Sequence, residues 1–282
     1  MDFYNILDQI EKADPEFQDR ISPRRAAIKN ITSFGSKVAV AAAPFAFATL
    51  FKKAYGQTAN ASVTTVLNFA LTLEYLESYF YNQGIAAPNL IPAADKSGYF
   101  TTIAAHEMAH VAFLKSVLSS AAVPSPNFDL TAKGTFPDVL TNYNTYLAVS
   151  LAFEDTGVRA YKGQAGNLLG NQVPLTAALQ IHAVEARHAS AIRYLLATKG
   201  FKGFNGQPIK PWISGSATVS NDTGIAAVNG NYAGENNISQ GGVDITTLNA
   251  VNGKTSLTAA IEAFDEPLDM PTVLNIVAPF IK

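Results

Sequence analysis

Two segments of the chain repeat one pattern of glutamate and histidine, and this repeat restricts the fold more than any other feature of the sequence. The segment "EMAHVAFLKSVL", which begins at Glu107, aligns with "EARHASAIRYLL", which begins at Glu185, at a shift of 78 residues. The aligned pairs are Glu107 with Glu185, His110 with His188, Lys115 with Arg193, and Leu118 with Leu196. Apolar residues recur at helical spacing in both segments, so we predict two equivalent amphipathic helices.

A second pair of segments repeats at nearly the same shift. The segment "LNFALTLEYLESYFY" from Leu67 aligns with the segment that lies 80 residues further on. Each is an apolar stripe with one glutamate in its middle, Glu74 or Glu154, and Tyr81 aligns with Tyr161. We expect the two tyrosines either to donate hydrogen bonds to the glutamates or to pack beside them. Two helix hairpins related by an internal two-fold predict an all-α four-helix bundle.

Helical periodicity and the residues that interrupt it divide the chain. The four helices are predicted over about residues 62–82, 100–121, 138–161 and 175–199, within a domain that spans residues 58–200. The breaks are marked by Pro124, Pro126, Pro137, Pro174 and Gly200. Residues 201–253 are rich in Gly, Asn, Ser and Thr and carry few charges. We therefore expect residues 201–282 to be an ordered, largely irregular extension packed on the bundle, with room for a short hairpin and with short helices at about 256–264 and 272–281.

The stretch "HEMAH", from His106 to His110, fits two kinds of site. It has the spacing of the zinc-protease signature, in which both histidines bind zinc and Glu107 is the general base. It also has the spacing of one Glu-x-x-His half of a two-metal helix bundle. The repeat favours the second interpretation, and no further zinc ligand follows His110 before the proline break. A zinc peptidase stays as a third alternative.

The spacing of the acidic residues predicts where the ligands lie. Residues three apart share one face of a helix, so each Glu-x-x-His pair can present an oxygen and a nitrogen to the same metal. Glu74 and Glu154 should face the bundle core, where an unpaired carboxylate is costly. We therefore predict two divalent ions, bridged by Glu107 and Glu185, with Glu74 and Glu154 as terminal ligands. Oxygen-rich ligation with one imidazole per ion favours iron or manganese.

Several nearby residues could take part in the same site. Glu77 lies one turn after Glu74 and competes for its role, but the repeat pairs Glu77 with Gly157, so Glu74 is the predicted ligand. His106 and His182 flank the two motifs, and we expect them to have structural roles or to hydrogen-bond to ligands.

Five segments carry a resemblance to a known family: "LNFALTLEYLESYFY", "HEMAH", "LAFEDTGVRAY", "VEARHASAIR" and "IEAFDEPLDMPTV". They resemble exported ferritin-like proteins related to desiccation-associated proteins, over nearly all of the chain after residue 60. The resemblance implies a ferritin-like four-helix bundle with a di-metal carboxylate site. The positions that match this site are Glu74, Glu107, His110, Glu154, Glu185 and His188.

The N-terminal segment has features of an export signal. The paired Arg24 and Arg25 precede the uncharged run "VAVAAAPFAFATLF" at residues 38–51, which resembles a twin-arginine leader. The run is short for a spanning helix. We expect residues 1–57 to be a leader and the protein to be periplasmic or on the cell surface. Lys52 and Lys53 favour retention, and an uncleaved leader would anchor the chain to the membrane.

Composition narrows the remaining function classes. The absence of cysteine excludes thiolate metal sites, and a net charge of -2 without a basic stripe argues against nucleic acid as a partner. The first hypothesis is an oxidoreductase of peroxidase, catalase or ferroxidase type, with O2 or peroxide as substrate. The second is a structural or stress-protective protein whose metals stabilise the bundle. Both hypotheses are compatible with a homo-oligomer.

Overall fold

The computed structural model describes residues 62–203, 206–215, 223–250 and 253–282. The predicted leader, residues 1–57, lies outside the described residues. Within the described ranges, no helix has both the length and the apolar character needed to cross a membrane.

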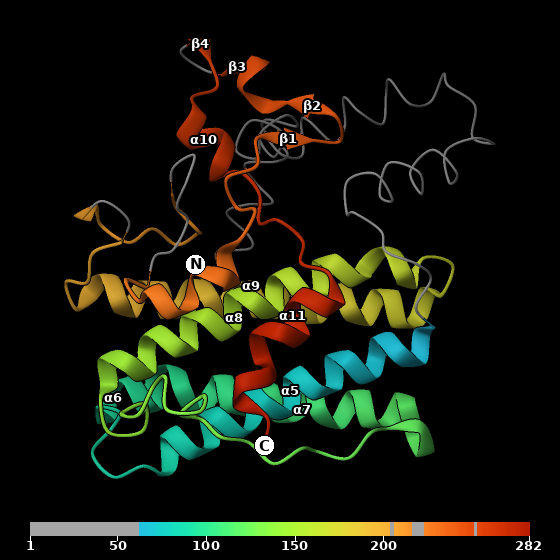
Figure 1. Ribbon diagram of the computed structural model, residues 1–282, viewed down its shortest axis with the longest axis vertical. Helices are drawn as coiled ribbons and strands as arrows, with labels where there is room; N and C mark the ends of the chain where they lie inside the picture. The colour runs from blue at the N-terminus through green and yellow to red at the C-terminus, as the bar shows by residue number, and fades with distance from the viewer. Residues whose placement is uncertain (1–61, 204–205, 216–222, 251–252) are drawn as a thin grey trace, which may run out of the picture. The chain divides into compact units, whose positions relative to one another are not determined.

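Four long helices form the bundle: α5 (Val63–Ala86), α7 (Thr101–Leu118), α8 (Tyr143–Ala165) and α9 (Gln172–Thr198). Helix α5 packs along α7, α8 packs along α9, and α5 also contacts α8 (Figure 1). The first hairpin is antiparallel, because Asn68 near the start of α5 donates a hydrogen bond of 2.9 Å to the carbonyl of Ala121, just after α7. The predicted all-α four-helix bundle is confirmed.

Two helix starts differ from the prediction for local reasons. Helix α8 begins at Tyr143 rather than near 138, because the Asn142 side chain caps it by accepting a hydrogen bond of 3.0 Å from the Asn144 amide. Helix α9 begins at Gln172, which places Pro174 inside its first turn. Proline is tolerated there because an amide in the first turn has no partner within the helix.

Short elements connect and follow the long helices. Before α7 lie α6 (Ala93–Asp95) and one π turn (Lys96–Phe100), and 3-10 turns follow α7 and α8 at Ser119–Ala121 and Gly166–Leu168. The C-terminal extension contains 3-10 helices at Ala226–Tyr232, Ile245–Thr247 and Ala278–Phe280, with α10 (Leu257–Ile261) and α11 (Met270–Val277). It also contains two antiparallel pairs of two-residue strands: β1 (Ser239–Gln240) with β2 (Val243–Asp244), and β3 (Asn249–Ala250) with β4 (Gly253–Lys254).

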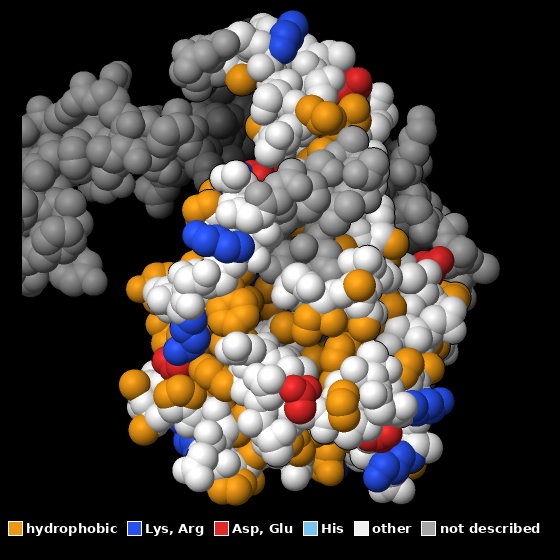
Figure 2. All heavy atoms as spheres, turned by 60° about the vertical axis from the view of Figure 1, so that its left-hand side comes forward, with side chains coloured by type: hydrophobic (Ala, Val, Ile, Leu, Met, Phe, Trp, Pro, Cys, Tyr) orange, Lys and Arg blue, Asp and Glu red, His pale blue; other side chains and the backbone are white. Residues whose placement is uncertain are grey.

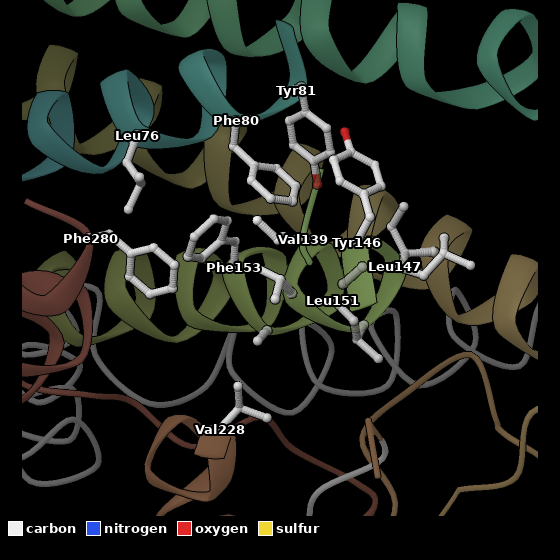
Figure 3. Close-up of a cluster of buried hydrophobic side chains, with 14 of the residues drawn as sticks. Leu76, Phe80, Tyr81, Val139, Tyr146, Leu147, Leu151, Phe153, Val228 and Phe280 are labelled. Carbon is white, nitrogen blue, oxygen red and sulfur yellow. The ribbon is translucent and has the colours of Figure 1, made fainter. Parts of the chain in front are cut away.

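Aromatic side chains fill much of the core. The rings of Phe80 and Tyr146 stack with centroids 4.6 Å apart, and Phe153 meets Phe280 edge to face at 4.9 Å. Figure 3 shows these rings from α5, α8 and the C-terminus turned toward one another. On α7 and α9, the predicted ligands lie between this cluster and a second apolar cluster that includes Leu114 and Ile181. The polar centre is therefore enclosed at both ends by apolar packing.

The C-terminal extension covers the outer side of α8, where every residue from Tyr146 to Tyr161 is buried. Helix α11 crosses in front of α8 (Figure 1) and contacts it. The backbone amide of Leu268 donates to the Arg159 carbonyl at 3.1 Å. A Cβ at Gly163 would collide with the Leu268 carbonyl, so this close approach requires glycine.

Charged residues make up only 15% of the chain. Figure 2 shows one face of the molecule, on which Lys, Arg, Asp and Glu side chains stand in small separate groups among hydrophobic ones. Among the residues that the structure describes, the large hydrophobic ones at least 48% exposed are Met108, Val173, Leu179, Tyr194 and Trp212. No single sign of charge dominates the face in this view.

Candidate metal centre

Each long helix brings a glutamate to the middle of the bundle. Glu74 lies on α5, Glu107 on α7, Glu154 on α8 and Glu185 on α9, and all four are fully buried. The helical spacing predicts this placement, because each glutamate lies on the apolar face that packs against the other helices. Helices α7 and α9 add one histidine each, three residues after the glutamate, so that both ends of each Glu-x-x-His motif point inward.

One half of the centre is organised around His110. Its Nδ1 atom lies 3.1 Å from carboxylate oxygens of Glu74, Glu107 and Glu185. These residues come from α5, α7 and α9, so three helices meet at this nitrogen.

The other half is organised around His188. Its Nδ1 atom lies 2.9 Å from Glu107, 3.2 Å from Glu154 and 3.2 Å from Glu185. Glu107 presents Oε2 to His110 and Oε1 to His188, while Glu185 presents Oε1 to His110 and Oε2 to His188. These two glutamates therefore connect the two halves, in the bridging positions that the sequence predicts.

The donor set fits metal ions. In each half, one ligand atom from every residue lies within 4.8 Å of the others, which is a geometry that can hold an ion. Within the centre, three buried carboxylate oxygens make no hydrogen bond of good geometry, although each lies 2.9–3.2 Å from a histidine Nδ1: Glu107 Oε1, Glu154 Oε2 and Glu185 Oε1. A buried oxygen without a donor is costly, and a cation would compensate it. The structure thus brings all six predicted residues together, and their binding of metal stays a prediction.

The electrostatics of the centre reflect many carboxylates in a small, dry volume. Burial, and then the charge of Glu185, raise the pKa of Glu74 well above its usual range. Burial likewise raises the pKa of Glu154, although His188 opposes the shift. Burial alone would lower the pKa of His110, but the surrounding carboxylates raise it to about 12. They raise the pKa of His188 as well, so that without metal both imidazoles hold protons between the carboxylates.

Comparison with known protein families identifies the bundle. Residues 62–198 match the family model of the ferritin-like domain. This segment is a ferritin-like domain. No curated protein matches the chain. The match confirms the ferritin-like part of the expected relationship, and it does not reach the extension after residue 198.

Two tyrosines of the ferritin-like domain support the terminal carboxylates from opposite helices. Tyr81 on α5 donates a hydrogen bond to Glu154 on α8, and Tyr161 on α8 donates one to Glu74 on α5. This exchange follows the internal two-fold. Of the two roles that the sequence allows, the structure selects hydrogen bonding, which orients both glutamates.

Glu77 is a buried carboxylate near the centre that belongs to neither half. It is 4% exposed, and neither group of prospective ligand atoms includes it. Its counterpart in the repeat, Gly157, has no side chain, and a Cβ there would lie 3.4 Å from Glu77 Oε1. The geometry therefore favours Glu74 over Glu77 as a ligand.

The remaining histidines have separate roles. His106 is exposed, and its Nδ1 lies 2.9 Å from Nε2 of His188, whereas neither ligand group contains His106. The zinc-protease interpretation requires His106 and His110 on one ion, and this arrangement does not fit it. His182 lies outside the centre and contacts the Val158 carbonyl through Nδ1 at 3.0 Å.

Sequence reasoning did not predict the burial of a group of charges beside the centre. Arg193 donates two hydrogen bonds, of 2.6 and 2.7 Å, to Asp155, the neighbour of Glu154. Arg159 lies 2.6 Å from Glu235 of the extension, and both are buried. The only signal for either pair was the alignment of Arg193 with Lys115, and Lys115 is exposed. The repeat therefore gave no reason to expect the Arg193 side chain to be buried.

Proposed function

We propose that the ferritin-like domain binds two divalent ions, iron or manganese, one in each half of the centre. Glu107 and Glu185 would be shared between the two ions, Glu74 and Glu154 would each bind one of them, and His110 and His188 would each supply Nδ1. The bridging arrangement of Glu107 and Glu185 is the observation that carries this proposal. Four carboxylates also balance the charge of two divalent ions, so that the dry centre becomes neutral.

The proposed activity is redox chemistry on O2 or a peroxide, of peroxidase, catalase or ferroxidase type. A bound pair of iron or manganese ions supplies electrons to such a substrate or takes them from it. The chain contributes burial, which excludes bulk water, and the hydrogen bonds of Tyr81 and Tyr161, which hold the terminal glutamates in place. The side chain of His110 is 11% exposed, so the centre lies close to the surface at this point.

Elemental analysis of the purified protein is the first test. We expect about two irons or manganeses per chain, and their loss in a Glu107→Ala, Glu185→Ala variant. Glu262→Ala is a matched control, because Glu262 lies in the extension and pairs with Lys210. One zinc per chain, or no metal in a folded protein, would contradict the di-metal centre.

A second measurement addresses the reaction. Protein shown to carry both ions would be mixed with hydrogen peroxide or, in air, with ferrous iron, and turnover would be followed against metal-free protein. Metal-dependent turnover of either substrate supports the proposed activity. Fully loaded protein that is inert toward both would contradict the redox proposal while leaving the metal centre in place.

A structural role for the metals is the second candidate function. The buried Arg159–Glu235 pair joins the extension to α8, so the domain has a tightly attached cover that a small redox bundle does not require. If the chain is related to desiccation-associated proteins, as we propose, this structural role would serve protection during drying. A Glu154→Ala variant that loses metal but still protects its host during drying would favour it. A variant altered in the extension that still binds metal but no longer protects its host would show that protection depends on the extension.

Export is proposed on the sequence alone, from Arg24, Arg25 and the uncharged run at residues 38–51. The test is cell fractionation of the full chain and of an Arg24→Lys, Arg25→Lys variant. We expect periplasmic or cell-surface protein from the first and retention in the cytoplasm of the second. Equal distribution of the two proteins would rule out the twin-arginine route.

A further inference from the structure

The internal two-fold of the ferritin-like domain is broken next to one of the two histidine ligands. At the repeat shift of 78 residues, His106 corresponds to Val184. His188 therefore has an imidazole beside it, whereas the position that the repeat relates to His106 carries an aliphatic side chain without hydrogen-bonding atoms.

The contact between the two imidazoles is direct. Nδ1 of His106 lies 2.9 Å from Nε2 of His188, and the two rings are nearly parallel, with centroids 5.2 Å apart. Nδ1 of His188 faces the carboxylates of Glu107, Glu154 and Glu185. His188 thus has one nitrogen directed at the centre and the other at His106.

This arrangement has a known physical effect on a metal ligand. When His106 accepts the Nε2–H of His188, the lone pair of His188 is confined to Nδ1, and the ring cannot rotate without breaking the hydrogen bond. Loss of such a partner typically lowers metal affinity about 10–100-fold. The effect is local to one ligand, so it should act on one of the two ion positions.

We propose that His106 is a positioning residue that holds His188 in its ligating orientation, and that the two ion positions are inequivalent as a result. The ion between Glu154 and His188 is held more tightly than the ion between Glu74 and His110. This inference rests on the proposed di-metal centre. Of the roles that the sequence allows for the first histidine of "HEMAH", it assigns the hydrogen bond to a ligand rather than zinc ligation.

The test measures Mn²⁺ affinity position by position in the full chain. Glu74→Gln removes a ligand from the His110 position only, and Glu154→Gln removes one from the His188 position only. Each variant is prepared metal-free, with and without His106→Phe, and titrated with Mn²⁺ by calorimetry and by the electron paramagnetic resonance signal of free Mn²⁺. We expect His106→Phe to weaken binding about 10–100-fold in the Glu74→Gln protein and to leave the Glu154→Gln protein unchanged.

Two further variants separate positioning from a general effect on the fold. His106→Gln keeps a hydrogen-bond acceptor and should recover part of the lost affinity. His182→Phe makes the same exchange at a histidine of α9 that contacts the Val158 carbonyl and belongs to neither ligand group, and it should change neither position. His106 is exposed, so we expect the unfolding transition of the His106 variants to match that of the parent chain.

The outcomes are distinct. Unchanged affinity in the Glu74→Gln protein, an equal loss at both positions, or no rescue by His106→Gln would overturn the positioning role while the di-metal centre stands. Failure of the unmodified chain to bind Mn²⁺ or Fe²⁺ would overturn the di-metal centre, and the role of His106 with it.

Discussion

A glutamate inside an apolar bundle needs partners, and Glu74 shows how this chain provides them. Its carboxylate faces His110 on one side and receives the Tyr161 hydroxyl on the other. Glu154 has the equivalent pair, His188 and Tyr81. Each terminal carboxylate is thus oriented from two helices other than its own, which restricts the positions that its oxygens can take.

Removal of one of these hydroxyls should destabilise the metal-free protein. Tyr161→Phe leaves a Glu74 oxygen without its donor in a buried site, so the free energy of unfolding should fall by about 1–3 kcal/mol. Tyr194→Phe is the control, because Tyr194 is 58% exposed and its exchange should change stability by less than about 0.5 kcal/mol. Urea denaturation of both variants gives the comparison, and equal effects would show that the Tyr161 hydrogen bond contributes nothing measurable.

Proton release should accompany metal binding. The carboxylates raise the pKa of His110 to about 12 and also raise that of His188, so both rings are protonated at neutral pH without metal. A metal that binds Nδ1 must displace these protons. Below the raised pKa values, higher pH therefore favours binding, and Kd should fall about tenfold per pH unit for each proton released.

Calorimetry in buffers with different ionisation enthalpies counts the protons, and we expect about two or more per fully loaded chain. Binding that is independent of pH between about 6 and 9 would contradict the protonated state of the histidines.

At the scale of elements, α8 is the helix on which the fold depends most, because it is enclosed on both sides. One face carries Glu154 into the centre, and the other carries Asp155 and Arg159 under the extension. Tyr232 of the extension donates a hydrogen bond of 2.7 Å to Asp155, which already pairs with Arg193 of α9. Polar contacts therefore fix the extension to α8 within one turn of a predicted ligand.

Truncation of Arg159 should loosen the extension. Arg159→Ala leaves Glu235 buried without its cation, so we expect a loss of about 3–5 kcal/mol in the free energy of unfolding. Lys210→Ala is the control within the same extension, since the Lys210 side chain is 39% exposed and its pair with Glu262 should contribute about 0–1 kcal/mol. Guanidinium denaturation measures both, and limited proteolysis should cut the extension faster in the first variant. Comparable losses in the two variants would argue against a special role for the buried pair.

At the scale of the whole molecule, metal binding at the centre should raise the free energy of unfolding. Ions that bind only the folded chain should add about 2.7 kcal/mol at a concentration one hundred times Kd. Calorimetric melting of protein with Mn²⁺ and with chelator should therefore show a Tm that is higher with metal, by roughly 2–4 °C for each kcal/mol. The Glu107→Ala, Glu185→Ala variant should show no difference between the two conditions. A metal-dependent shift that persists in that variant would place the ions elsewhere.

Local sequence determined much of this protein. The apolar period and the spacing of each Glu-x-x-His motif depend on residues within two helical turns, so they predicted four helices and the inward direction of Glu107 and Glu185. The repeat then related Glu74 to Glu154 without any structure. Helix ends were less predictable, because caps such as Asn142 compete with the periodic pattern.

Only the tertiary structure decided the contacts between distant segments. The exchange of tyrosines between α5 and α8, the imidazole pair of His106 and His188, and the burial of Arg159 against Glu235 join residues 73 to 87 positions apart. Such contacts depend on how the helices are placed against one another and on what covers them, to within about an ångström. The periodicity of one helix contains no information about that distance, so the sequence indicated which residues face inward, and packing decided which partners they meet.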